Sequence, residues 1–323
     1  MKKIIMSSVL FACIASLAVI SCGGGEGGSD ENISIPIAPT APVITAGNGK
    51  LVLNWEAVSG ATSYTVWYND DNNSGTATQS GADISSLSHT ITGLDNGATY
   101  YVWLKSKNAG GASDWGSVAD GIPMPPPRDD LRGEWLFSGN ANDTSGNNSA
   151  TTVYGATLAT DRFGNVYSAY SFNGTSDYIQ TDVNSNTLPL SYSVWFNLQG
   201  TTGAHCIVDS DVGGHCGHSI AYTYTQNLLQ VEYHDQWTII DNTLLENNQW
   251  YHLVVNYSDT IEVYLNGVLI HEEVYPTATL DGSNYRFGRH SLPSGNYYNG
   301  YMDDIRIYYR VLTQDEVLLL YCE

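Results

Sequence analysis

Apolar and polar residues alternate along several short segments that begin near residue 50. The segment KLVLNWEAV places Leu51, Leu53 and Trp55 at every second position, and SYTVWYND alternates in the same way from Tyr64 onward. A period of two is typical of a strand with one buried and one exposed face. The pattern predicts a β-domain over residues 37–123.

A second series of alternating segments follows residue 129. WYHLVVNY and IEVYLNGVLI both alternate, and Asn266-Gly267 in the second of them predicts a tight turn between two strands. LTQDEVLLL lacks this period, and Thr313 with Glu316 three residues later forms the pattern of a capping box. We therefore expect an all-β chain with one short helix in its last segment.

The segment IPMPPPRDD separates the two series of strands and contains four prolines. Prolines favour an extended, semi-rigid chain, which predicts a joint between two domains; a proline-rich recognition motif is the alternative. The predicted organisation is a signal peptide at 1–21, a flexible tether at 22–36, a first β-domain at 37–123, a proline-rich linker at 124–128 and a second β-domain at 129–323.

Both β-domains resemble known families. In the first, Trp55 matches the core tryptophan of a fibronectin type III domain, and Leu94 and Tyr100 match its tyrosine-corner stretch. The second resembles a laminin-G-like, concanavalin-type domain through GEWLFSGNANDTSGNNS, SAYSFNGTSDYI, YSVWFNL, NNQWYHLVVNYSDTIEVYLNGVLI, YRFGRH and GYMDDIRIYYRVLTQDEV, in that order. The resemblances imply an immunoglobulin-like fibronectin type III sandwich followed by a jelly-roll sandwich of two antiparallel sheets.

The N-terminal residues predict export. MKKIIMSSVLFACIASLAVISC opens with two lysines and continues with an apolar run typical of a signal peptide. Its end, VISC, resembles a bacterial lipobox, which implies that Cys22 is lipidated; a plain secretory signal is the alternative. The glycine-rich tether CGGGEGGSDEN follows. We expect a lipid-anchored protein of the bacterial outer membrane or cell surface.

The charge balance narrows the class of ligand. The 323 residues include 33 acidic and 12 basic side chains, a formal net charge of −21. Such a surface repels phosphate, which argues against a nucleic-acid ligand.

Two neighbouring carboxylates, Asp303 and Asp304, lie in the strand-like segment GYMDDIRIYYR. Consecutive side chains of a strand point to opposite faces, so we expect them to diverge and not to form the carboxylate pair of a glycoside hydrolase. The resemblance implies that the first and last strands of the domain are neighbours, which would bring Asn140 and Asp143 close to this pair. We predict a structural calcium site at Asn140, Asp143, Asp303 and Asp304. The alternative is an ion pair of Asp303 or Asp304 with Arg306 or Arg310.

Cysteine and histidine concentrate in AHCIVDSDVGGHCGHSI. An oxidising compartment favours a disulfide between Cys206 and Cys216. A zinc site that also uses His205, His215 and His218 is the alternative. Cys322 is then a free thiol or the partner of one of these cysteines.

Aromatic and planar polar side chains gather in the second domain and suggest sugar recognition. The candidate ligand-binding residues are Tyr222, Tyr224, Tyr233, Trp237, Arg286, Arg289, Tyr297 and Tyr298. We expect a surface protein that binds glycans or protein ligands through its jelly roll, with the fibronectin-like domain as a spacer and without catalysis. The alternatives are a glycoside hydrolase, or an accessory subunit of polysaccharide degradation, on the same fold, and a structural adhesin.

Overall fold

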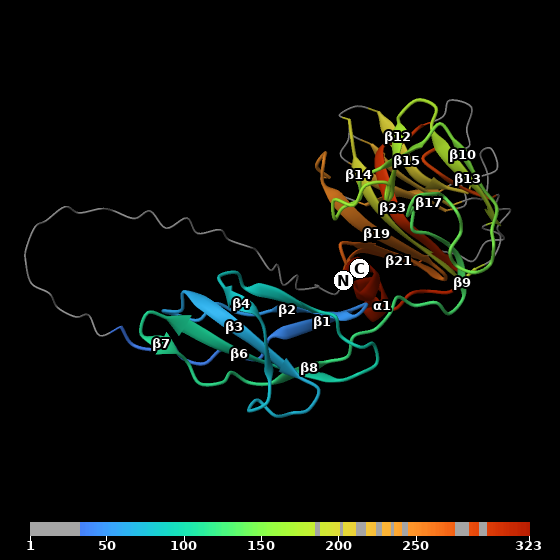
Figure 1. The fold of residues 1–323 in the computed structure, drawn as a ribbon. Coiled ribbons are helices and arrows are strands. Elements are labelled where there is room, and N and C mark those ends of the chain that lie inside the picture. Colours follow the sequence, from blue (N-terminus) through green and yellow to red (C-terminus); the bar gives the residue numbers. More distant parts are fainter. Residues whose placement is uncertain are drawn as a thin grey trace, which may run out of the picture.

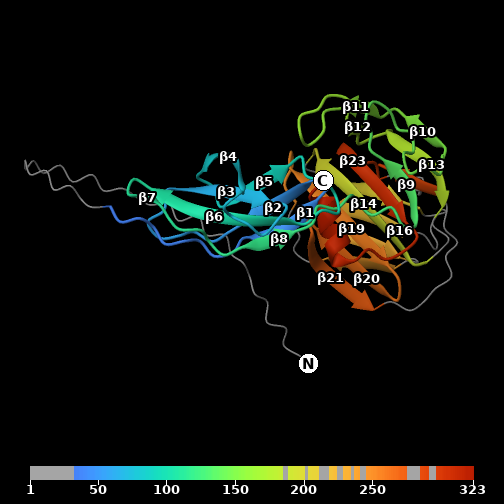
Figure 2. The ribbon, with the colours of Figure 1, turned by 60° about the horizontal axis from the view of Figure 1, so that its bottom comes forward.

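The computed structural model describes residues 33–184, 188–200, 203–210, 218–223, 228–233, 236–240, 245–274, 284–290 and 296–323. For residues 232, 233, 236, 237 and 239 it describes the backbone alone. Figures 1 and 2 show two β-rich domains that meet at α1. Within the described ranges, no helix is long and apolar enough to span a membrane.

The N-terminal domain is a sandwich of antiparallel sheets. Among the described residues, one sheet has the order β1-β2-β5 and the other the order β4-β3-β6-β7, with β8 paired to β6. Their bounds are β1 (Val43–Gly47), β2 (Lys50–Asn54), β5 (Ser88–Thr92), β3 (Ser63–Asn69), β4 (Thr78–Ile84), β6 (Tyr100–Asn108), β7 (Gly111–Ala112) and β8 (Ala119–Gly121). Leu51, Leu53 and Trp55 are buried between the sheets, as their alternation predicts. The Tyr100 hydroxyl accepts a hydrogen bond from the Asp95 amide at 3.1 Å, which confirms the tyrosine corner.

The C-terminal domain is a sandwich of two larger antiparallel sheets. In the described part of the chain, the seven-stranded sheet has the order β10-β13-β22-β15-β16-β17-β18, and the eight-stranded sheet the order β11-β12-β23-β14-β19-β20-β21, with β9 also paired to β23. The first sheet comprises β10 (Thr151–Tyr154), β13 (Tyr178–Asn184), β22 (Asn284–Phe287), β15 (Ala204–Asp209), β16 (His218–Thr223), β17 (Leu228–Tyr233) and β18 (Gln236–Ile240). The second comprises β11 (Thr157–Ala159), β12 (Ala169–Asn173), β23 (Asn299–Tyr308), β14 (Leu190–Leu198), β19 (Trp250–Tyr257), β20 (Thr260–Leu265), β21 (Val268–Val274) and β9 (Leu131–Trp135).

The alternating pattern of each strand decides which side chains face the core. Along β14, the apolar side chains of Tyr192, Val194 and Phe196 join the core between the two sheets. Trp195 and Asn197 alternate with them and therefore face the outer side of the eight-stranded sheet. This outer face carries the candidate functional site.

The single predicted helix is α1 (Gln314–Tyr321), and both sides of its predicted capping box are present at Thr313 and Glu316. Its buried residues Val317 and Leu320 pack with Val254 on the outer face of the eight-stranded sheet. The helix thus covers one half of that face and leaves the β11–β12 half open. The predicted turn is also confirmed, because Asn266 and Gly267 join β20 to β21 with φ angles of 50° and 78°.

The two domains are joined by more than the proline-rich linker. The Lys50 ammonium donates a hydrogen bond to the backbone carbonyl of Glu323 at 2.8 Å. A cavity of about 250 Å³ lies between β1 and α1, lined in part by Ile44, Met124 and Leu318. The Tyr308 hydroxyl also donates to the carbonyl of Pro127 at 3.1 Å. These contacts oppose free rotation of one domain against the other.

Candidate functional site

A straight row of five side chains crosses the open half of the outer face of the eight-stranded sheet. Trp250 of β19 lies opposite Asn197 of β14, and Asn197 lies opposite Tyr301 of β23. Tyr301 in turn faces Ser171 of β12, which faces Thr157 of β11. The five strands follow one another across the sheet in Figure 2. Directly opposed residues share a face, so these side chains form one continuous surface.

This row forms the floor of a groove with a volume of about 550 Å³. The groove is lined by Thr157, Leu158, Ala159, Thr160, Ser171, Asn197, Gln199, Asn248, Trp250 and Tyr301. Every lining residue is neutral. The Trp250 and Tyr301 rings lie 6.4 Å apart at 38°, and the Gln199 amide donates to the Asn197 amide oxygen at 2.8 Å. The groove therefore combines two aromatic faces with amide and hydroxyl groups.

Tyr298 holds the backbone of the groove in place. It is a core residue, and its hydroxyl lies 2.8 Å from the carbonyl oxygen of Asn197 and 3.1 Å from that of Tyr301. Gly300 lies between Tyr298 and Tyr301 in the sequence and has a φ angle of 150°. A side chain at this position would collide with the Asn197 carbonyl. The sequence predicts Tyr298 as a ligand-binding residue, but its side chain points inward and supports the groove from below.

A buried cluster of charged side chains borders the groove. It lies beside the next outward-facing row of the sheet, in which Trp195 of β14 is paired with Asp303 of β23. Arg162 follows the groove residue Thr160 by two positions, and its guanidinium donates to Asp303 and to Asp304, each at 2.7 Å. The side chain of Arg162 is 6% exposed, and the Trp195 ring lies 4.6 Å from its guanidinium carbon. The cluster fixes the start of the β11–β12 loop against β23.

The expectation that Asp303 and Asp304 diverge is wrong, and a β-bulge is the reason. The pairing of β23 with β14 shifts by one residue between Asp303 and Arg306, and Asp304 has a φ angle of 43°. An extra residue in one strand breaks the strict alternation of side chains. Both carboxylates therefore reach the same arginine. Arg162 is 141 residues from Asp303 in sequence, so no local pattern indicates this partner.

The surroundings of Asp303 change its ionisation. Burial, followed by the neighbouring charge of Asp304, raises the pKa of Asp303 to about 8, although Arg162 opposes the shift. Asp303 therefore keeps its proton to a higher pH than an exposed aspartate does.

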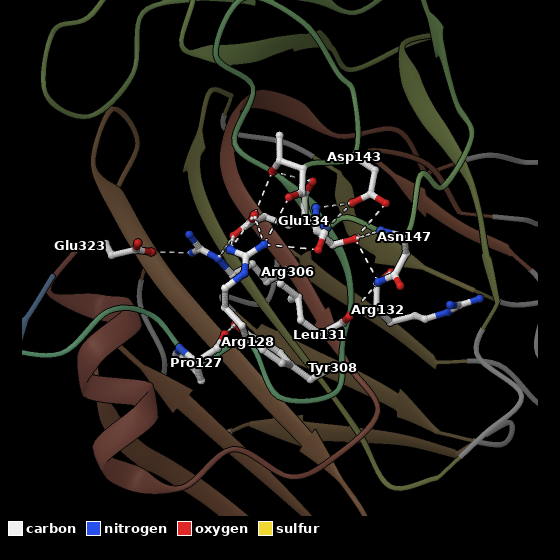
Figure 3. A network of polar contacts seen from close by, with 12 residues as sticks. Pro127, Arg128, Leu131, Arg132, Glu134, Asp143, Asn147, Arg306, Tyr308 and Glu323 are labelled. Atoms are coloured by element: carbon white, nitrogen blue, oxygen red, sulfur yellow. Dashed lines mark hydrogen bonds and ion pairs between the residues drawn. The ribbon is translucent and has the colours of Figure 1, made fainter. Parts of the chain in front are cut away.

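Arg306 and Arg310, the predicted ion-pair partners of Asp303 and Asp304, bind other acids. Arg306 pairs with Glu134 of β9 at 2.9 Å and with Glu323 at 2.6 Å, and Figure 3 shows this network. Arg310 pairs with Glu316 of α1 at 2.7 Å. The pairing of β9 with β23 brings Glu134 opposite Arg306, and it confirms that the first and last strands of the domain are neighbours.

Asp143 lies close to Glu134 but is fully engaged by its own loop (Figure 3). Its carboxylate accepts hydrogen bonds from the amides of Glu134, Ser145 and Ser149 at 2.9–3.0 Å. Burial alone would raise the pKa of Asp143, but these hydrogen bonds hold it below its ordinary value. Asn140 likewise caps its loop by accepting from the Asn142 amide at 2.8 Å.

The carboxylates named for calcium have protein partners in the structure. In the ranges that the structure covers, no three His, Cys, Asp or Glu side chains gather to hold a metal ion. Asp303 and Asp304 also face the guanidinium of Arg162, which repels a cation. Calcium therefore stays a prediction from the sequence.

The cysteine and histidine predictions fall partly outside the described residues. Cys206 is buried in β15, whereas His215 and Cys216 lie outside the described ranges, so the disulfide and the zinc site both stay predictions. Cys322 carries a free thiol. Burial lowers the pKa of His218 to about 3, which keeps this imidazole neutral.

The other predicted ligand-binding residues divide into three groups. Tyr222 is a core residue, because it faces inward on β16, and Arg286 pairs with buried Asp209 at 3.4 Å. Tyr224 lies outside the described residues, and of Tyr233 and Trp237 only the backbone is described. Arg289 and Tyr297 form the third group, because the Arg289 guanidinium carbon lies 5.5 Å from the Tyr297 ring.

The sequence reasoning missed Trp250, Tyr301 and Asn197. All three occupy outward-facing positions of alternating strands. This alternation was the only signal in the sequence for them, and many other polar and aromatic residues share it.

Comparisons with known proteins agree with this architecture. Residues 38–121 match the fibronectin type III domain, and residues 173–318 match the concanavalin A-like lectin/glucanases superfamily. No curated protein matches the chain.

Three solved structures illustrate the fold. Domain 4 of AbnA, an extracellular arabinanase from Geobacillus stearothermophilus in complex with arabinotriose, has 21% identity and a TM-score of 0.48 over 59% of this chain and 98% of its own. A structure described as a receptor binding domain has 18% identity and a TM-score of 0.50 over 60% of this chain and 51% of its own. A botulinum neurotoxin type C structure, whose cell entry depends on two ganglioside molecules, has 17% identity and a TM-score of 0.47 over 60% and 51%.

This chain thus spans about half the length of the last two structures. At these identities the likeness extends to the fold alone. The two family matches and the two sandwiches lead to one conclusion: the chain carries a fibronectin type III domain followed by a concanavalin A-like lectin/glucanase domain.

Proposed function

We propose that this protein binds a neutral glycan in the groove formed by Trp250, Asn197 and Tyr301. The observation that carries the proposal is a neutral groove with two aromatic rings beside amides and hydroxyls. A sugar presents apolar C–H faces that pack on aromatic rings, and a rim of hydroxyls that pairs with planar amides. The lining matches both properties.

The arrangement of the carboxylates supports binding over hydrolysis. Glycoside hydrolysis uses two carboxyl groups that flank the bound sugar. The groove lining contains no acidic residue. The nearby Asp303 and Asp304 have side chains only 3% and 16% exposed and are bound to Arg162. Neither is placed to transfer a proton to a ligand in the groove.

Replacement of Trp250 by alanine tests the groove. We expect the affinity for a neutral oligosaccharide to fall at least about 10-fold, because tryptophan is among the residues whose truncation costs most binding energy. Trp250→Phe should retain part of the affinity, since a flat ring remains. The measurement is calorimetry with the full chain against gluco-, galacto-, xylo-, manno- and arabino-oligosaccharides.

Trp115→Ala is the matched control, since Trp115 is also a half-buried tryptophan but lies in the N-terminal domain. It should leave sugar affinity unchanged. Equal affinity of the Trp250→Ala variant and the wild type would contradict the groove. A wild-type protein that binds no saccharide and captures a surface protein instead would favour the adhesin.

The surface location is part of the proposal and rests on the lipobox-like VISC at the end of the apolar N-terminal run. A lipid on Cys22 would hold the domains at the membrane and raise the local concentration of the binding site. The Cys22→Ala protein should leave the membrane fraction in fractionated cells. Unchanged membrane retention of this variant would refute the anchor.

A further inference from the structure

Arg289 differs from the other buried or half-buried arginines in its partners. Among the described residues, each of the four others holds a carboxylate: Arg162, Arg286, Arg306 and Arg310. Arg289 makes no ion pair with any residue that the structure describes, and its Nε atom is buried without a hydrogen-bond partner among them. The chain has 33 acidic residues for 12 basic ones, so an arginine left without an acid is unexpected on statistical grounds.

Aromatic rings hold Arg289 in place instead. Its guanidinium carbon lies 5.0 Å from the Tyr178 ring and 5.5 Å from the Tyr297 ring. Arg289 and Tyr297 also form a backbone bridge, which fixes them opposite each other. Tyr154 stacks on Tyr178 at 4.3 Å and 9°, and it is 44% exposed. One arginine and three tyrosines thus form a cluster at the start of β13 and the end of β10.

This geometry suits an anion attached to a ring that has an apolar face. A guanidinium packed against rings keeps its N–H donors free, because they lie in its own plane, and it binds a carboxylate through two parallel hydrogen bonds. The stacked Tyr154 and Tyr178 rings offer an apolar surface on which a sugar ring can lie. The nearby acid Asp209 is already paired with Arg286 and does not compete.

We propose that Arg289, with Tyr154, Tyr178 and Tyr297, forms a second ligand site that binds the carboxylate of an acidic sugar. The site is separate from the neutral groove, since its residues belong to the seven-stranded sheet and its flanking loop, whereas those of the groove belong to the eight-stranded sheet and its loops. This second site gives the domain a preference for acidic sugars. The groove does not supply that preference, because none of its lining residues is charged.

Digalacturonic acid is the probe, titrated into the full chain by calorimetry at low salt. We expect Arg289→Met, which retains much of the packing, to weaken binding at least about 10-fold, because a bidentate charge-assisted contact is lost. Arg289→Lys should weaken it by a smaller factor, since the charge remains without the fork. Galactobiose, the neutral analogue, and galactose 6-sulfate separate a carboxylate site from a neutral or sulfate site.

Arg132→Met is the matched control, because Arg132 also lies over a tyrosine ring, at 5.7 Å from Tyr309, but is exposed. It should bind digalacturonic acid like the wild type. Equal melting temperatures would show that Arg289→Met is folded. The proposal is overturned if the wild type does not bind digalacturonic acid, if it prefers the neutral or sulfated probe, or if Arg289→Met binds equally well.

Discussion

Replacement of Arg162 by methionine is expected to lower the free energy of unfolding by about 3 kcal/mol, because it removes the counter-charge of a buried acid pair. Asp303 and Asp304 would then face each other with side chains 3% and 16% exposed. Methionine retains much of the volume that packs on Trp195, so the loss reports mainly on charge. Denaturant unfolding monitored by tryptophan fluorescence measures the change.

Arg310→Met provides a control with contacts of the same length that are more exposed to solvent. Arg310 also makes two contacts of 2.7 Å to a carboxylate, Glu316, but these side chains are 20% and 24% exposed. Its replacement should cost about 1 kcal/mol or less, since exposed ion pairs contribute little. A second change, Asp303→Asn, should restore part of the stability lost in Arg162→Met. Equal costs for Arg162→Met and Arg310→Met would contradict the role assigned to burial.

The contribution of Asp303 to the free energy of unfolding is expected to fall as the pH rises from about 6.5 to 8, by about 1 kcal/mol per pH unit. The pKa of Asp303 is raised to about 8 in the folded protein, first by burial and then by Asp304. Between its unfolded and folded pKa values the folded state binds the proton that the unfolded state releases, so stability falls with rising pH. Asp303→Asn should flatten this dependence.

The pH range matters because buried histidines act in the opposite direction. Burial lowers the pKa of His218 and His252 to about 3, so both imidazoles stay neutral in the folded protein. In the unfolded protein they take up protons as the pH falls through about 6.5, and this uptake favours the unfolded state. The free energy of unfolding therefore falls as the pH is lowered through this range. Above about pH 7.5 the histidines are largely neutral in the unfolded state as well, so they contribute little slope there. Unfolding curves of wild type and Asp303→Asn between pH 6.5 and 9 isolate the aspartate. Parallel pH dependences of the two proteins would show that Asp303 does not carry the effect.

The candidate site shows why its residues escape sequence reasoning. Trp250, Asn197 and Tyr301 belong to strands far apart in the chain, and they become neighbours only through the register of β19, β14 and β23. Tyr222 and Tyr298 are also aromatic residues of strand-like segments, but their side chains point inward. Amino-acid type alone does not distinguish a tyrosine that binds a ligand from one that fills a core, because aromatic residues favour strands in either place.

The features that depend on local periodicity and on short-range contacts follow from the amino-acid sequence. It was enough to predict the buried faces around Leu51 and Leu53, the Asn266-Gly267 turn and the capping box of α1, because each depends on residues a few positions apart. The tertiary structure alone decided that a bulge turns Asp303 and Asp304 toward Arg162. It also decided that five distant strands align one neutral row of side chains, because the register between strands is a long-range property of the packed sheet.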